Sequence, residues 1–226
     1  RKPCGRQNSQ DELTMNTEPL VIRIYAKLFG WLASVTPFAI LRRVVPPMRS
    51  SNGVELWVLG NTILALMVAS VISYSPESFW SLVLIGYGIW RTFEIVVTQM
   101  NVMFFDEWRA KRDGRNYSLR SYRRMALLLM HNFAELIFWF TAVLIALNHD
   151  AQIQINNADF WATLRASVVS MVSFSSGDIK PLNPLASGIL CAQSVIGIFM
   201  TLLTLSRFIS LIPAPATQDG TERWKQ

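Results

Sequence analysis

Four long apolar runs, separated by polar or proline-containing segments, dominate the pattern of the chain. They cover residues 54–73, 79–105, 125–147 and 185–212. A membrane-spanning helix needs about 20 predominantly apolar residues, and each run supplies at least that many. The pattern therefore predicts an all-α membrane protein with four transmembrane helices.

A shorter apolar segment lies between the third and fourth runs. Residues 158–173 are long enough for a buried helix but too short to cross a bilayer. Asn156 and Asn157 precede this segment and Asp159 lies in its first turn. Asparagine is a favoured N-cap, and an early acidic residue complements the helix dipole. We expect one re-entrant helix here, capped by the two asparagines.

The segment before the first span mixes apolar and basic residues and contains Pro37. Residues 20–44 carry four basic side chains, Arg23, Lys27, Arg42 and Arg43. Helices of this composition lie in the membrane interface and contact anionic lipids. We predict an interfacial helix on the inner leaflet, broken near Pro37. An N-terminal helix packed on the bundle is an equally weighted alternative.

The distribution of charge predicts the orientation of the spans. Only 16% of the residues are charged, against a usual share of about 25%, and the net charge is +6. The polar loop 106–124 holds seven Lys or Arg and three acidic residues, whereas residues 74–78 and 148–157 hold no basic residue. The excess of Lys and Arg on cytoplasmic loops places both termini inside. The sequence contains no basic face with interleaved aromatic residues, so nucleic-acid binding is not expected.

Residues 167–181 read Ser-Val-Val-Ser-Met-Val-Ser-Phe-Ser-Ser-Gly-Asp-Ile-Lys-Pro. This stretch resembles the pore loop of potassium-channel-like proteins, whose pattern is small-Val-Val-Thr-x-Thr-Thr-Val-Gly-Tyr-Gly-Asp-x-x-Pro. The frame matches without a gap from Ser167 to Pro181. The resemblance covers roughly residues 125–212. It implies an outer helix, a pore helix with a filter, an inner helix, and four-fold assembly into a homotetramer in the cell or plasma membrane.

The apolar runs, the charges and, for residues 125–212, the resemblance together divide the chain into six segments. These are a polar tail (1–19), an interfacial segment (20–50), a peripheral transmembrane hairpin (51–105), a basic cytoplasmic loop (106–124), a pore domain (125–212) and a cytoplasmic tail (213–226).

The core of the filter differs from the family pattern. Ser173, Phe174, Ser175 and Ser176 stand where the family has Thr, Val, Gly and Tyr. A non-glycine residue in the left-handed region costs about 1–2 kcal/mol, so we do not expect the family's carbonyl cage to be copied. Serine hydroxyls would line a wider mouth that passes monovalent cations with little selectivity and needs no cofactor or metal. The predicted filter residues are Ser173, Phe174, Ser175, Ser176, Gly177 and Asp178.

Further functional positions follow from the resemblance in the last span. Gly197 lies where the family has a gating hinge, nineteen residues after Asp178. Close helix packing explains a glycine there equally well. Gln193, Thr201 and Thr204 would face an inner cavity.

Charged residues inside predicted spans form a second candidate site, which comprises Arg91, Glu94, His131 and Glu135. A charge at the centre of a membrane helix costs at least about 2.5 kcal/mol, so we expect Arg91 to pair with Glu94, Glu135 or both. The preferred interpretation is a structural polar clamp that holds the first helical hairpin to the pore module. The more specific alternative is a voltage or proton sensor. His131 and Glu135, four residues apart, could titrate or bind a metal.

The sequence contains no hydrolase, phosphate-loop or zinc-protease motif, so we do not expect an enzyme. Two alternatives to a weakly selective cation channel remain open. The first is a non-conducting pore-loop scaffold or regulatory subunit. The second is a small membrane transporter or enzyme that uses Arg91, His131 and Glu135 and acts as a monomer or dimer.

Overall fold

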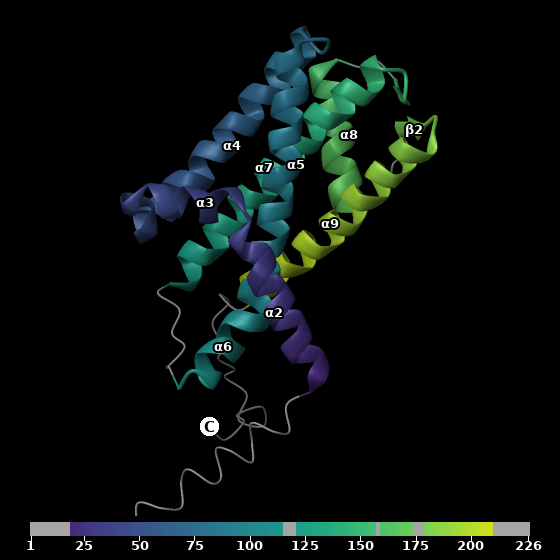
Figure 1. Cartoon of the computed structure of the whole chain (residues 1–226). Helices are drawn as coiled ribbons and strands as arrows, with labels where there is room; N and C mark the ends of the chain where they lie inside the picture. Colours follow the sequence, from purple (N-terminus) through teal and green to yellow (C-terminus); the bar gives the residue numbers. More distant parts are fainter. Residues whose placement is uncertain (1–18, 115–120, 157–158, 174–178, 210–226) are drawn as a thin grey trace, which may run out of the picture. The chain divides into compact units, whose positions relative to one another are not determined.

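The structure is a computed structural model that describes residues 19–114, 121–156, 159–173 and 179–209 (Figure 1). Most of these residues are helical. Four helical stretches are long and apolar enough to cross a membrane, namely Ser51–Tyr74, Phe79–Arg112, Arg123–His149 and Pro184–Ile209. The prediction of an all-α membrane protein with four candidate spans is therefore confirmed at this level.

The chain divides into two compact units. The first comprises residues 1–51 and 89–118, and the second comprises residues 52–88 and 119–226. The boundary falls inside helix α5 (Phe79–Met100), which contributes its first turns to the second unit and its remaining turns to the first.

The first unit begins with two helices that meet at a break. Helices α2 (Leu20–Ser34) and α3 (Pro37–Val44) lie at 59° to each other. Thr36 caps α3, because its hydroxyl accepts from the amide of Ala39, and the hydroxyl donates to the carbonyl of Ala33. Proline at the first helical position suits this start. The predicted break near Pro37 is confirmed, and its place in the membrane interface stays a prediction.

The predicted polar loop 106–124 is wrong in its first part. After α5 the chain continues through a π-helical turn, η2 (Asn101–Phe105), into α6 (Asp106–Arg112). Acidic residues open α6, basic residues close it, and Lys111 pairs with Glu107 at 2.7 Å. These charges complement the helix dipole and stabilise a polar helix where an apolar pattern ends. The short 3₁₀ helix η1 (Pro46–Arg49) precedes α4.

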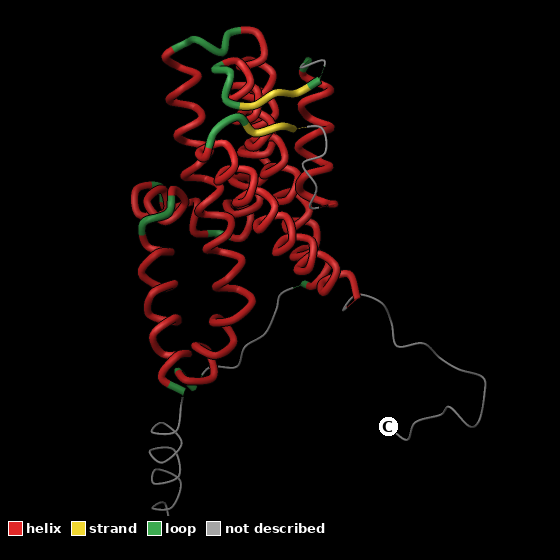
Figure 2. The backbone as a smooth tube through the Cα atoms, turned by 90° about the vertical axis from the view of Figure 1, so that its right-hand side faces the viewer, coloured by secondary structure: helices red, strands yellow, loops and turns green. Residues whose placement is uncertain are grey.

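The second unit contains α4 (Ser51–Tyr74), the start of α5, α7 (Tyr122–His149), α8 (Phe160–Ser173) and α9 (Pro184–Ile209). Figure 2 shows the two short strands, β1 (Ile153–Ile155) and β2 (Ile179–Pro181), which pair antiparallel with Gln154 opposite Lys180. The predicted segments 125–147, 158–173 and 185–212 thus correspond to α7, α8 and α9, although residues after Ile209 lie outside the described part.

Two hydrophobic clusters hold the second unit together. One lies where the strands meet the helices and includes Leu144 of α7, Ile179 of β2 and Leu190 of α9. The other packs Trp139 of α7 against Ala65 and Ile72 of α4. Because α7 contributes to both clusters, it is the central helix of this unit.

The cap of α8 is Asp159, and not the predicted Asn156. The carboxylate of Asp159 accepts a hydrogen bond of 2.6 Å from the amide of Ala162, three residues later. Its negative charge also lies at the positive end of the helix dipole. Asn156 lies in a turn after β1, and Asn157 is outside the described residues.

Polar contacts mark the two ends of the spans in the second unit. Arg124, at the start of α7, pairs with Glu55, at the start of α4. At the opposite end, His149 closes α7 and lies 3.2 Å from Glu77 in the turn after α4. The two helices therefore run in the same direction, and a polar contact joins them at each end.

Candidate functional site

Helix α8 occupies the centre of the first candidate site. It has 14 residues and a length of about 21 Å, which is shorter than the bilayer core of about 30 Å. It packs on both α7 and α9, and its buried residues are Thr163, Ala166, Ser167, Ser170 and Met171. The buried face is thus rich in small and hydroxylated side chains, which allow close approach of the neighbouring helices.

Ser167 joins the three helices through hydrogen bonds. Its hydroxyl donates to the carbonyl of Ile137 on α7 at 3.0 Å. The side-chain amide of Gln193 on α9 donates to the Ser167 hydroxyl at 3.2 Å and to its carbonyl at 3.3 Å. Ser167 and Gln193 are fully buried. We refer to Ile137, Ser167 and Gln193 as the three-helix junction.

One turn further along both helices, Gly197 of α9 contacts the main chain of Met171 on α8. A Cβ at Gly197 would lie 2.9 Å from the Cα of Met171 and closer still to its carbonyl oxygen. Only glycine fits at such a contact. The packing explanation for Gly197 therefore has direct support, and its role as a gating hinge stays a prediction.

Most of the predicted filter lies outside the described residues. Residues 174–178 are in this group, so only Ser173 can be placed. Ser173 is the last residue of α8, and its hydroxyl donates to the carbonyl of Val169 at 2.6 Å. The predicted filter therefore begins where α8 ends.

The chain directly after the predicted filter is held in place. Ile179 is buried in β2, which pairs with β1. The amide of Leu182 donates to the carbonyl of Gln152, and the side chain of Asn183 contacts Gln152 and caps α9 by accepting from Ala186. The segment after the motif is thus fastened to the loop that precedes α8.

The three predicted cavity residues have different surroundings in the chain. Gln193 does not face open space, because its side chain is buried against α8. Its predicted cavity-lining role is therefore replaced by a place in the three-helix junction. Thr204 donates to the carbonyl of Met200 at 2.7 Å, and the hydroxyl oxygen of Thr201 is buried. For these two threonines the cavity role stays a prediction.

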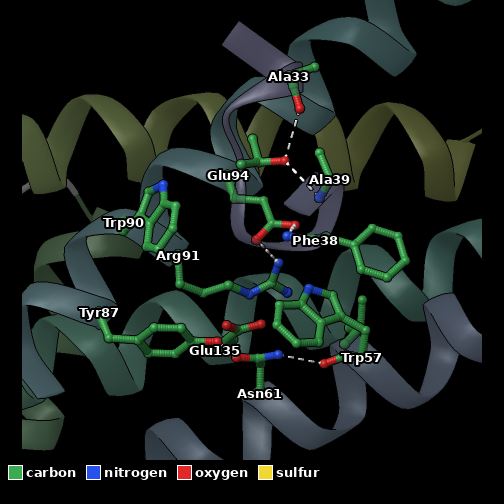
Figure 3. A network of polar contacts seen from close by, with 12 residues as sticks. Ala33, Phe38, Ala39, Trp57, Asn61, Tyr87, Trp90, Arg91, Glu94 and Glu135 are labelled. Carbon is green, nitrogen blue, oxygen red and sulfur yellow. Dashed lines mark hydrogen bonds and ion pairs between the residues drawn. The ribbon is translucent and has the colours of Figure 1, made fainter. Parts of the chain in front are cut away.

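The predicted charge pair is present in the first unit. Arg91 and Glu94 of α5 are both 3% exposed, and their side chains form an ion pair of 3.0 Å (Figure 3). The Glu94 carboxylate also accepts from the amide of Phe38 in the first turn of α3, at 3.3 Å. The pair therefore clamps α5 to the break between α2 and α3. The predicted clamp between the first hairpin and the pore module stays a prediction.

Three residues that the sequence reasoning missed extend this clamp along α5, η2 and α6. The Trp90 indole donates to the carbonyl of Val35, Asn101 donates to that of Phe29, and Arg109 donates to that of Ala26. Arg109 also donates to Asn101 at 2.7 Å. Polar residues near the end of an apolar run could have indicated such contacts. A single sequence, however, does not show that their partners are main-chain carbonyls.

His131 and Glu135 belong to the second unit. Glu135 is fully buried and accepts from the indole of Trp139 at 3.1 Å. The His131 ring contacts the carbonyl of Leu127 at 2.8 Å, within the same helix. Among the described residues no group of three potential His, Cys, Asp or Glu ligands comes together, so the metal hypothesis for this pair gains no support. Pairing of Glu135 with Arg91 stays a prediction.

Comparison of the chain with protein-family models, curated proteins and solved structures finds no match. The candidate sites therefore rest on the sequence motif and on the local geometry.

Proposed function

We propose that the protein is a weakly selective cation channel of the potassium-channel-like, pore-loop type. The observation that carries the proposal is the position of α8. This short helix packs between two helices of membrane-spanning length and ends at Ser173, where the filter-like motif begins. A non-helical segment at membrane depth is tolerated where it lines a cavity or is buried in protein.

The electrostatics of α8 suit a cation. The Asp159 carboxylate caps its N-terminus. As in any helix, the C-terminal end carries the negative end of the helix dipole. That end lies beside the start of the motif. A dipole oriented in this way favours a cation over an anion at the position where the motif residues would act.

The proposed conduction element consists of Ser173 to Asp178. Serines at positions 175 and 176, in place of glycine and tyrosine, offer hydroxyl oxygens that coordinate Na⁺ and K⁺ through water with little discrimination. An Asp178 ring would attract cations at the outer mouth, partly offset by Lys180. One motif cannot enclose a pore, so we propose a homotetramer with α7, α8 and α9 at its centre.

The ends of the helices support a cytoplasmic location of both termini, with the motif facing outward. Arg123 and Arg124 begin α7 and Arg207 lies in the last turn of α9. Glu77 and Asp150 lie at the opposite end, near His149. This asymmetry matches the excess of basic residues on the cytoplasmic side of membrane proteins. Basic residues of α2 and α3 would then contact anionic lipids of the inner leaflet of the cell membrane.

Substitution at Ser175 tests the proposed conduction element. Ser175→Trp would obstruct a narrow pathway at this position, and we expect cation flux to fall by more than about tenfold. The control is Ser187→Trp, since Ser187 is an exposed residue of α9 beyond the motif. Undiminished flux in the Ser175 variant would contradict the proposal.

The oligomeric state separates the proposal from its alternatives. A tetramer of 25.7 kDa chains is expected by native mass spectrometry. A tetramer without flux would favour the non-conducting scaffold. A monomer or dimer would favour the transporter or enzyme, whose substrate would bind within a single chain.

A further inference from the structure

We propose that Gln193 is a positioning residue, which fixes the height of α8 along α9 and thereby sets the point at which α8 ends. Its consequence for ion selection rests on the proposed channel function. The positioning itself rests on the three-helix junction and can be tested without conduction.

The first argument is the way in which Gln193 reaches α8. Its amide donates to the carbonyl and to the hydroxyl of the same residue, Ser167. A helical carbonyl retains a second lone pair after its bond within the helix, so it can accept the amide without loss of helical structure. The bond to the main chain ties the backbone of α8 itself, not only a side chain that could rotate.

The second argument is register. Ser167 and Met171 are four residues apart on α8, and their partners Gln193 and Gly197 are four residues apart on α9. The two contacts therefore lie one turn apart on each helix, and the helices run in the same direction where they meet. A slide by one turn would bring Gln193 or Thr201 to the place beside Met171 that only Gly197 fits. Gly197 permits the approach, and Gln193 fixes the height.

The third argument is that stability alone does not explain a glutamine here. Gln193 and Ser170 are fully buried, and among the described residues the Gln193 carbonyl oxygen and the Ser170 hydroxyl have no hydrogen-bond partner. A buried polar atom without a partner is costly, and an apolar residue of the same size would avoid this cost. We therefore infer that glutamine at this site defines the position of α8 along α9, and that it does not add stability.

The axial position of α8 determines where its C-terminal residue, Ser173, lies, and the motif starts at that residue. Ser173 lies six residues after Ser167 on the same unbroken helix. A shift of α8 by even a fraction of a turn would move Ser173 relative to β2, which is fastened to β1. The length of chain between Ser173 and Ile179 is fixed by the sequence, so the height of α8 constrains the geometry available to the motif.

The test compares Gln193→Met with a matched control, Leu190→Met. Both changes conserve volume at a buried position of α9, but only the first removes hydrogen bonds to α8. Hydrogen exchange of the α8 amides is measured on the full chain in lipid nanodiscs, and the K⁺ to Na⁺ permeability ratio in liposomes. In Gln193→Met we expect α8 exchange to rise about tenfold, and the permeability ratio to change by at least about twofold. In Leu190→Met neither should change.

Unchanged α8 exchange in Gln193→Met would overturn the positioning role. Faster exchange with an unchanged permeability ratio in a conducting protein would overturn the link to ion selection. Faster exchange in a protein whose native form does not conduct would support positioning and contradict the proposed function. If Gln193→Met does not fold, Ser167→Ala, which removes only the hydroxyl, gives the same readouts, and unchanged exchange in that variant would count against the junction.

Discussion

Gly197 of α9 lies against the main chain of Met171 of α8, with no room between the helices for a methyl group. The neighbouring glycine of the same helix, Gly188, has open space around its Cα. Two glycines in one apolar helix thus have different roles, which the sequence alone does not distinguish.

Gly197→Ala should destabilise the protein. The new methyl would meet backbone atoms of Met171, which cannot rotate away as the end of a side chain can, so α8 or α9 must shift. Overpacking of this kind costs about 1–3 kcal/mol. The free energy of unfolding, measured in detergent micelles by titration with a denaturing detergent, checks this.

Gly188→Ala is the matched control. Because nothing lies within 4 Å of the added atom, the higher helix propensity of alanine should stabilise the protein by up to about 1 kcal/mol. Equal effects of the two substitutions would show that the close contact at Met171 does not exist.

Gly88→Ala should also destabilise the protein, through the second unit's central helix. A Cβ at Gly88 would lie 2.8 Å from Cδ2 of Trp139 and closer still to Cε3. Trp139 is 2% exposed and packed in a cluster, so its ring cannot move without disturbing that cluster. We expect a loss of about 1–3 kcal/mol, accompanied by a change in tryptophan fluorescence. Gly86→Ala, whose added methyl meets nothing within 4 Å, should leave the tryptophan fluorescence unchanged and, like Gly188→Ala, should not destabilise the protein.

Removal of one partner of the Arg91–Glu94 pair should cost more than removal of both. Arg91→Met leaves the Glu94 carboxylate buried without its ion-pair partner, and such a change typically costs about 3–5 kcal/mol. In the double variant Arg91→Met with Glu94→Gln neither member of the pair carries a buried charge, so part of the stability should return. Unfolding measurements on both variants give the comparison. A double variant that is as unstable as the single one, or less stable, would contradict the clamp.

Asp159→Ala should destabilise α8 by about 1 kcal/mol, because it removes the N-cap. Asp159→Asn keeps a capping oxygen and should retain most of the stability. Asn156→Ala should lower the thermal unfolding temperature less than Asp159→Ala does. The opposite order would contradict the assignment of Asp159 as the cap.

The positions of the spans could be predicted because long apolar runs reflect the thickness of the bilayer core. The break at Pro37 was also visible, since proline and a preceding threonine are local signals for a helix start. α6 was missed for a physical reason. Its stability comes from charge pairs and the helix dipole, so no apolar periodicity marks it.

The contacts between helices were less predictable. The direction of Gln193 depends on the rotation of α9, and a single sequence does not fix the rotation of a helix that is apolar on all sides. The same uncertainty applied to Gly197, for which hinge and packing were both open. Asp159 and Asn156 are both good caps, and only the geometry of the turn after β1 decides between them.

Cation flux from liposomes that contain the purified full chain tests the central claim most directly. K⁺ and Na⁺ gradients are compared in parallel vesicles, with protein-free vesicles as the blank. The proposed weakly selective channel predicts flux of both ions at similar rates. Flux of neither ion would contradict the channel proposal, and flux of K⁺ alone would contradict the weak selectivity inferred from the serine-rich motif.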